Sequence, residues 1–425
     1  MKQMKFRILF IFTIIIFTIL VFADSYNVFS HADVYYTRPD LDFWSFKSVD
    51  TMKYSRDLSR EKMEDKDFDA VIDDQVKNIA AIGSTHVAIA TPYDSEFIPM
   101  LKRWVGAARK YKLKVWFRGN FSGWEEWFDY SRITKEEHLR NTGEFIRFNS
   151  DLFEDGDIFS SCPECENGGP GDPRSTGDVE GFREFIIGEY REAKSAFKSI
   201  NKKVQANYFS MNADVARFVM DEETTEALDG IVTIDHYVST PEQLAQDVED
   251  IASGSGGSVV LGEFGAPIPD IHGDLSESEQ AKWVERALWI LKDSGKLKGI
   301  NYWTAVGGST SIWGDDGKEK EAAGVLNKYY DPKTFYGVVY NELDEIVPDA
   351  KVSYSGKYIL SDTRGYFEFP YLDDVNAVVK ISARGYLNKE LAIDPAGGQA
   401  EIVLVKESKD LGFRLEELVK KILFK

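Results

Sequence analysis

The chain has 425 residues, which is more than one hydrophobic core usually organises, so two or more domains are expected. Hydrophobic residues make up 43% of the sequence and charged residues 29%, which is typical of a globular protein and excludes a chain that is disordered throughout. The formal net charge of −20 argues against nucleic acid as a partner, because its phosphates would be repelled.

The N-terminus carries the pattern of a targeting segment. Basic side chains among the first seven residues precede the apolar run 8–22, and Val21 and Ala23 then give a small-residue pattern suited to signal peptidase. We therefore expect residues 1–23 to be a signal peptide, which would make the protein secreted or place it at the cell surface. A retained N-terminal membrane anchor is the alternative, although the apolar run is short for a membrane-spanning helix.

From about residue 40, short apolar runs alternate with segments whose apolar residues recur at helical spacing. The expected strands are 43–50, 86–90, 114–118, 157–160, 204–208, 230–235, 258–261 and 299–303. The expected helices are 68–82, 97–111, 136–148, 179–200, 213–228, 241–251, 276–293 and 321–330. This alternation over residues 40–330 predicts an α/β fold, a parallel sheet closed into a (β/α)8 TIM barrel. An open doubly wound sheet is the alternative, but no glycine-rich phosphate turn follows an early strand.

After residue 331 the pattern changes to short β-rich runs separated by turn residues. The runs are 336–340, 350–354, 366–369, 377–381 and 401–405, and they predict a small antiparallel all-β sandwich over residues 334–405. The stretches 337–339, 348–352, 361–367 and 383–386 resemble the carboxypeptidase regulatory-like family of transthyretin-type β-sandwich domains. That resemblance implies a noncatalytic accessory domain for adhesion or spacing.

The last segment, residues 409–425, places leucine, isoleucine and valine on one helical stripe with lysines opposite. This pattern predicts an amphipathic helix. Docking on its own protein is the commoner role of such a helix, and binding to a membrane surface or a partner is the alternative. Attachment to a membrane or cell surface is thus possible through either terminus.

Cys162 and Cys165 are the two cysteines of the chain, in a C-x-x-C spacing. A zinc site would need further ligands at a suitable spacing, and the neighbouring sequence supplies none, so we expect no metal or other cofactor. Glycines and a proline follow the pair, whereas a thioredoxin-type motif opens a helix. A local disulfide and two free thiols both remain open.

Two glutamates follow buried strands at positions that suit catalysis. Glu164 comes after the fourth expected strand and Glu263 after the seventh. The carboxyl ends of these strands lie across one mouth of an eightfold barrel, where partial burial lets neighbouring groups set a pKa. Two carboxyl groups roughly 5–5.5 Å apart can cleave a glycosidic bond with retention. Glu166 is the alternative to Glu164 if the strand register differs.

Residues 40–330 resemble clan A of the retaining glycoside hydrolases, of the cellulase and mannanase type. The Gly-Glu-Phe-Gly stretch at 262–265 matches the nucleophile strand of that family. The Pro-Glu-Cys stretch at 163–165 stands where the family usually has Asn-Glu-Pro. The resemblance implies that Glu263 is the nucleophile and Glu164 the acid/base.

The resemblance extends to two other strand ends. His236 and Tyr237 match a pair after the sixth strand whose tyrosine supports the nucleophile, and Trp303 matches the platform under the sugar at the cleavage point. Pro163 departs from the family, whose asparagine there binds the sugar 2-hydroxyl. Asn167 or another residue would have to replace that contact.

Further strand ends carry residue types that bind sugars. Aromatic faces stack on pyranose rings, while carboxylate, amide and guanidinium groups hydrogen-bond hydroxyls. The candidates are Asp50, Arg118, Asn120, Trp124 and Tyr208. A plain structural role is the alternative for each of them, and for Trp124 this means packing under the third loop.

The sequence therefore predicts an exported retaining glycoside hydrolase that cleaves β-linked glycans by double displacement. Its partner would be a polysaccharide or oligosaccharide substrate. A catalytically inactive barrel that binds carbohydrate is one alternative, because the departure at Pro163 leaves room for it. A cell-surface interaction protein that acts through the β-sandwich is the other.

Overall fold

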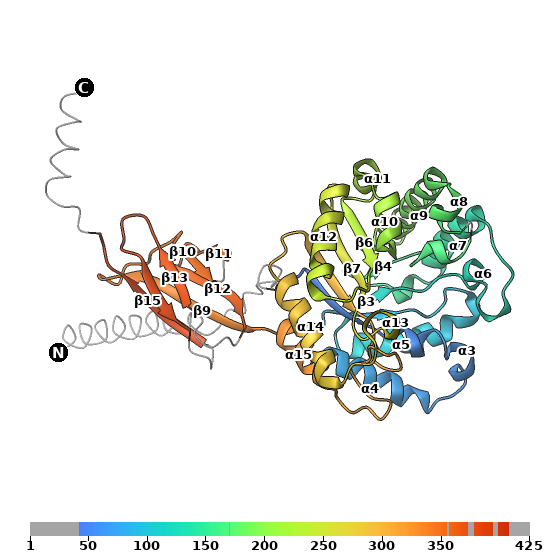
Figure 1. Cartoon of the computed structure of the whole chain (residues 1–425), viewed down its shortest axis with the longest axis horizontal. Coiled ribbons are helices and arrows are strands. Elements are labelled where there is room, and N and C mark those ends of the chain that lie inside the picture. Colours follow the sequence, from blue (N-terminus) through green and yellow to red (C-terminus); the bar gives the residue numbers. More distant parts are fainter. Residues whose placement is uncertain (1–41, 170, 355–356, 373–377, 394–397, 408–425) are drawn as a thin grey trace, which may run out of the picture. The chain divides into compact units, whose positions relative to one another are not determined.

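The computed structural model describes residues 42–169, 171–354, 357–372, 378–393 and 398–407 (Figure 1). The predicted signal or anchor segment, 1–23, and the predicted tail helix, 409–425, lie outside these residues. Within the ranges just given, no helix is long and apolar enough to cross a membrane.

Eight parallel strands form one sheet in the order β4-β3-β2-β1-β8-β7-β6-β5. They are β1 (Phe46–Asp50), β2 (His86–Ile89), β3 (Lys114–Phe117), β4 (Ile158–Phe159), β5 (Ser210–Asn212), β6 (Ile231–Asp235), β7 (Ser258–Phe264) and β8 (Leu297–Tyr302). A parallel bridge between Ile158 and Gln205, just before β5, joins the two edge strands. The sheet therefore closes, and the predicted TIM barrel is confirmed.

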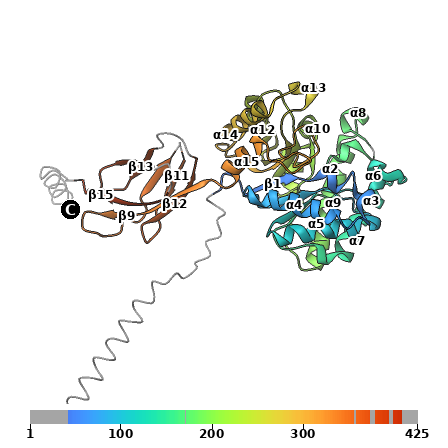
Figure 2. The same ribbon diagram turned by 90° about the horizontal axis from the view of Figure 1, so that it is seen from below.

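Helices surround the strands (Figures 1 and 2). The longer ones are α4 (Phe68–Ala81), α5 (Ile98–Lys110), α7 (Lys135–Phe148), α9 (Val179–Ser199), α12 (Pro241–Ser255), α14 (Glu277–Leu291) and α15 (Glu321–Tyr330). Shorter α-helices are α2 (Met52–Ser55), α3 (Ser59–Lys62), α6 (Ser122–Glu125), α8 (Pro173–Thr176), α10 (Ala213–Val219), α11 (Glu222–Ala227) and α13 (Pro269–His272). Four 3₁₀ turns are η1 (Ser95–Phe97), η2 (Trp127–Asp129), η3 (Ser150–Leu152) and η4 (Cys165–Asn167). Each long helix turns an apolar stripe toward the strands, which buries it.

A second set of apolar side chains fills the inside of the barrel. Phe46, Trp116 and Tyr208 meet edge to face, with ring centroids 5.5 to 5.8 Å apart. Gly299 leaves room for the Phe46 ring, since a Cβ there would lie 2.1 Å from it. This aromatic layer closes the interior below the carboxyl ends of the strands, as side-chain layers do in such barrels.

The fifth strand differs from its prediction. Residues 204–208 were expected to pair, but only Gln205 bridges to β4 and the strand β5 begins later, at Ser210. The reason is Tyr208, whose ring fills the barrel interior and whose carbonyl accepts a hydrogen bond from the Ser160 hydroxyl at 2.5 Å. The hydrogen bond from the Ser160 side chain thus takes the place of a backbone hydrogen bond between neighbouring strands.

Two helices also differ from their predictions. The expected helix 213–228 is divided into α10 and α11, because Asp221 caps α11 by accepting from the Thr224 N–H at 2.8 Å. The helix expected over 241–251 runs on to Ser255 as α12 and ends at Gly256, whose left-handed backbone suits a glycine.

The C-terminal strands form two small sheets. One has the order β11-β10-β13-β14 and the other β12-β9-β15. Their bounds are β9 (Lys333–Asn341), β10 (Lys351–Tyr354), β11 (Lys357–Leu360), β12 (Tyr366–Tyr371), β13 (Val378–Ser382), β14 (Lys389–Ala392) and β15 (Gly398–Leu404). The sheets share an apolar core that includes Val339, Val352, Phe367, Ile381 and Ile402. The predicted β-sandwich is confirmed, but β11 and β14 were not expected, and β15 pairs with β9 in parallel.

Candidate active site

The carboxyl ends of the barrel strands bring polar side chains together around Arg118, which lies just after β3 and is buried. Its Nη2 lies 2.9 Å from a carboxylate oxygen of Asp235, at the end of β6, and 2.9 Å from one of Glu263, in β7. Its Nε lies 3.6 Å from Asp50, at the end of β1. Because parallel strands of a barrel end at one rim, carboxylates distant in sequence meet on one cation.

A bulge in β7 sets this arrangement. The register between β6 and β7 shifts so that Asp235 lies opposite Glu263 and Gly262 is passed over. The Gly262 carbonyl accepts hydrogen bonds from Arg118 Nη1 and from the side-chain amide of Asn301, the latter at 2.8 Å. A Cβ at position 262 would lie 2.4 Å from Asp235 Oδ1, so the close approach requires glycine.

The cluster is rich in carboxyl groups for a single guanidinium. Burial raises the pKa of Asp50 to about 6, although Arg118 opposes the change. Burial also raises the pKa of Asp235, again against Arg118. The pKa of Glu263 is raised well above its ordinary value by burial and by the charges of Asp235 and Glu164, while Arg118 lowers it. One cation does not offset the burial of all these carboxylates, so their pKa values lie above the ordinary range.

Both carboxylate oxygens of Glu263 accept a hydrogen bond. Arg118 Nη2 donates to Oε1 at 2.9 Å, and the Tyr237 hydroxyl donates to Oε2 at 2.8 Å. The Tyr237 ring meets the half-buried Trp303 edge to face, with centroids 6.2 Å apart. These contacts hold the carboxylate in one orientation beside an aromatic wall.

Glu164 lies on the loop after β4, in a left-handed backbone conformation with φ 47°. Its backbone N–H donates to the Ser210 carbonyl at 2.7 Å, and the Asn167 amide donates to its Oε2 at 3.1 Å. Burial raises the pKa of Glu164 to about 8, with further contributions from Asp235 and Glu166. The charge of Glu164 in turn contributes to the raised pKa of Glu263.

Glu166, the alternative to Glu164, has a different environment. It is buried, and its Oε1 accepts the Asn212 N–H at 2.6 Å. Burial raises the pKa of Glu166 to about 7. The charge of Glu164 is among the main causes of the raised pKa of Glu263. This interaction favours Glu164 as the electrostatic partner of Glu263, while Glu166 accepts from the Asn212 backbone.

A disulfide and the packing of Trp124 fix the loop that carries Glu164. A disulfide joins Cys162 and Cys165, which decides between the two states that the sequence left open. The buried Trp124 donates from Nε1 to the Cys165 carbonyl at 3.1 Å and stacks on Phe185, with centroids 4.8 Å apart. Trp124 thus packs under the loop, and its buried ring offers no face to a sugar.

Asn120 belongs to a buried series of polar contacts. Its amide donates to Glu125 Oε1 at 3.0 Å, and its carbonyl oxygen lies 2.9 Å from His138 Nε2. The other ring nitrogen of His138 lies 3.0 Å from Glu189 Oε1. Burial raises the pKa of Glu125 to about 7. These contacts connect α7 and α9 to the mouth of the barrel. The sequence does not predict them. The available signal is that His138 and Glu189 are polar residues within the apolar stripes of their helices.

The structure separates three other candidates from the central cluster. Tyr208 lies in the barrel interior, and its hydroxyl donates to Gln205 at 2.6 Å. His236 turns away from Glu263, with Nε2 2.7 Å from Asp247 Oδ2. Asn167 is exposed and contacts the site through Glu164.

The sequence does not single out three side chains at the centre, which are Asp235, Ser210 and Asn301. Arg118 Nη2 donates to Asp235 Oδ2 at 2.9 Å and to the Ser210 hydroxyl oxygen at 3.3 Å. Asp235 ends an apolar strand as Asp50 does, and that shared position was the available signal. Among the residues that the structure describes, no group of three or more His, Cys, Asp or Glu side chains is placed to hold a metal ion.

Comparisons with known proteins find likeness in structure alone. No family model and no curated protein matches the sequence. A GH5_18 protein of Bifidobacterium longum subsp. longum in complex with Manb1-4GlcNAc is similar, with a TM-score of 0.50 and 14% identity over 71% of this chain and 84% of that one. This likeness shows the barrel fold.

Two further similar structures are glycosidases. Beta-glycosidase BGL167 has a TM-score of 0.47 and 16% identity, over 68% of this chain and 96% of that one. Bacteroides uniformis beta-glucuronidase 2 has a TM-score of 0.45 and 12% identity, over 79% of this chain. The match spans 44% of the length of that glucuronidase.

Proposed function

We propose that the protein is a retaining glycoside hydrolase that cleaves β-linked glycans. The observation that carries the proposal is the pair formed by Glu263 and Glu164. Glu263 is oriented through both oxygens by Arg118 and Tyr237. Glu164 has a pKa of about 8, raised first by burial, so it is protonated at neutral pH. Double displacement requires Glu263 to be ionised for its attack and Glu164 to be protonated for its donation.

In the proposed reaction Glu263 attacks the anomeric carbon while Glu164 gives its proton to the departing glycosidic oxygen. The product of this step is a glycosyl ester on Glu263 and a free alcohol. Glu164, now ionised, takes a proton from water, and the resulting attack releases the sugar with its original anomeric configuration. The Tyr237 hydroxyl and Arg118 hold the carboxylate of Glu263 ready for the attack.

The surrounding residues take supporting parts in this proposal. Trp303, edge to face with Tyr237, forms the platform under the reacting sugar. Asn167 donates to Glu164, so it orients the acid and does not bind the sugar 2-hydroxyl. Asp50 acts through Arg118, which lies 3.6 Å away.

We further propose that residues 1–23 direct export and that residues 334–405 form an accessory domain that places the barrel, residues 40–330, near its substrate. The disulfide between Cys162 and Cys165 supports an oxidising location, where such bonds persist. Sequencing the N-terminus of the mature protein distinguishes the two forms of export. A protein released into the medium has lost residues 1–23, whereas a protein retained at the membrane keeps them.

The test of the proposed function is hydrolysis of a panel of aryl β-glycosides and β-linked oligosaccharides by the full chain. We expect E263Q and E164Q each to lose most activity, while E166Q, the matched variant on the same loop, keeps more of it. NMR of the first product should show the β-anomer. Binding of a glycan without turnover by the wild-type protein would instead favour an inactive carbohydrate-binding barrel.

A further inference from the structure

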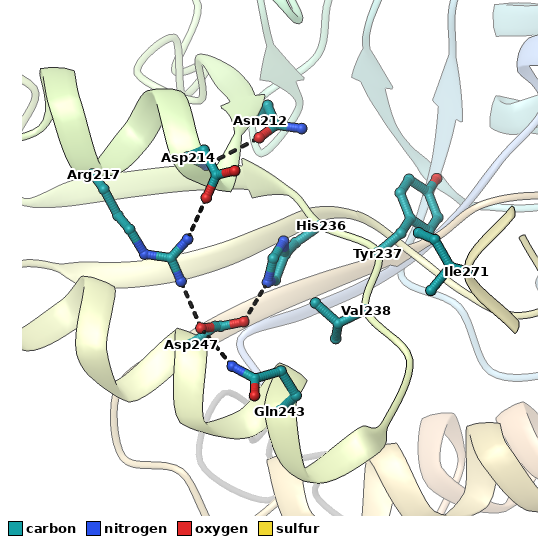
Figure 3. Close-up of a pocket in the computed structure, with 9 residues that line it drawn as sticks. All are labelled: Asn212, Asp214, Arg217, His236, Tyr237, Val238, Gln243, Asp247 and Ile271. Carbon is teal, nitrogen blue, oxygen red and sulfur yellow. Dashed lines mark hydrogen bonds and ion pairs between the residues drawn. The ribbon is translucent and has the colours of Figure 1, made fainter. Parts of the chain in front are cut away.

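A pocket of about 480 Å³ opens beside the candidate active site (Figure 3). Tyr237, whose hydroxyl donates to Glu263, forms one wall, so the pocket adjoins the central cluster. Other walls include Asn212 at the end of β5, Gln243 in α12 and Ile271 in α13. A volume of this order suits a small-molecule ligand.

The charged side chains of the pocket are paired with one another (Figure 3). Arg217 lies 2.8 Å from Asp214 and 2.5 Å from Asp247. Asp247 also lies 2.7 Å from His236 Nε2 and accepts the Gln243 amide at 3.0 Å. Because Arg217 is shared between two carboxylates, the pocket has no spare cation for an anionic ligand.

The pocket also presents the mixed surface that a sugar needs. Val238 and Ile271 supply apolar patches for C–H faces, next to the ring of Tyr237. The Asn212 carbonyl oxygen accepts the Asp214 N–H at 3.0 Å, and Figure 3 shows its amide nitrogen turned away from that contact. Gln243 is exposed at the pocket wall. Neutral hydroxyl groups can exchange hydrogen bonds with both amides.

The pocket is tied to the loop of the proposed acid. Glu164 N–H donates to the Ser210 carbonyl, and Asn212 N–H donates to Glu166, at 2.7 and 2.6 Å. A general acid gives its proton to the departing oxygen, so the leaving group lies on the side of Glu164. We propose that this pocket binds an uncharged sugar unit of the leaving group, an inference that rests on the proposed function. The substrate is then a neutral oligosaccharide or polysaccharide with at least one unit on each side of the cleaved bond.

The experiment uses the full chain carrying E263Q, which removes the proposed nucleophile and leaves the pocket intact. Binding of neutral β-linked oligosaccharides and of uronate-containing ones is measured by calorimetry. We expect neutral oligosaccharides to bind, and Q243A and I271S each to weaken that binding by about tenfold, since each removes one or two direct contacts. Q246A is the matched control, because Gln246 is exposed on the same helix and does not line the pocket.

The same substitutions are then made in the active chain. Their effect on kcat/KM should be several-fold larger for oligosaccharides than for aryl monoglycosides, whose leaving group is not a sugar. Equal binding by Q243A, I271S and Q246A, preference for uronate-containing chains, or no binding of any oligosaccharide would each overturn the inference.

The two proposals fail in different ways. Hydrolysis that disappears with E263Q, together with pocket variants that bind normally, would leave the proposed function standing without the pocket. If the wild-type chain does not hydrolyse any substrate but the pocket variants weaken oligosaccharide binding, the pocket is a sugar-binding site and the proposed function fails.

Discussion

Replacing Asp235 with asparagine should move the whole pH profile of hydrolysis toward lower pH. The negative charge of Asp235 raises the pKa of Glu263, after the larger effect of burial, and raises the pKa of Glu164 in the same way. Asp235 also shares Arg118 Nη2 with Glu263. Asparagine keeps the size of the side chain, removes the charge and leaves Arg118 more fully to Glu263.

The size of the expected pKa change follows from the distance between Asp235 and Glu263. The oxygens of Asp235 and Glu263 both lie 2.9 Å from one nitrogen, so they are at most twice that distance, 5.8 Å, apart. With an effective dielectric constant of about 20, two unit charges at that separation interact by about 3 kcal/mol, or about two pKa units. Arg118 neutralises part of this field, so we expect a change of about one to two pH units.

The direction is the same for both limbs of the profile. Glu263 must be ionised to attack, and without Asp235 it loses its proton at lower pH, so the acid limb moves down. Glu164 must be protonated to donate, and it too loses its proton at lower pH, so the basic limb moves down as well. The optimum therefore shifts to lower pH.

The assay is kcat/KM for an aryl β-glycoside, measured across the pH range over which each variant stays folded. Glu242→Gln is the control, because Glu242 is exposed and pairs with Arg286 at the surface. An acid limb in D235N that stays in place or moves to higher pH, with a wild-type melting temperature, would refute the electrostatic role given to Asp235.

Three further predictions follow from the contacts. Tyr237→Phe should lower kcat/KM by about 10- to 100-fold by removing one donor to Glu263, and an unchanged rate would contradict that role. Replacing Cys162 and Cys165 with alanine should lower the free energy of unfolding by about 1 to 2 kcal/mol, the value for a very short closed loop, as measured by urea denaturation. Arg109→Met should lower it by about 3 to 5 kcal/mol, because the fully buried Asp157 loses its charged partner; a loss similar to that of a surface substitution would argue against this.

The sequence by itself determined the alternation of strands and helices and the placement of carboxylates at strand ends. Both are local properties, since apolar periodicity depends on neighbouring residues and a strand end can be read where an apolar run stops. Glu164 and Glu263 are candidates for this reason, and the barrel follows from the number of repeated units.

The tertiary structure decided where the side chains point. The bulge at Gly262 places Asp235 opposite Glu263, and no local pattern signals that register. Trp124, Tyr208 and His236 all follow or belong to predicted strands, yet their side chains pack under a loop, fill the barrel and pair with Asp247. The direction of a side chain at a strand end depends on the alternation of the strand and on what its neighbours leave open, and both are settled only when distant segments pack together.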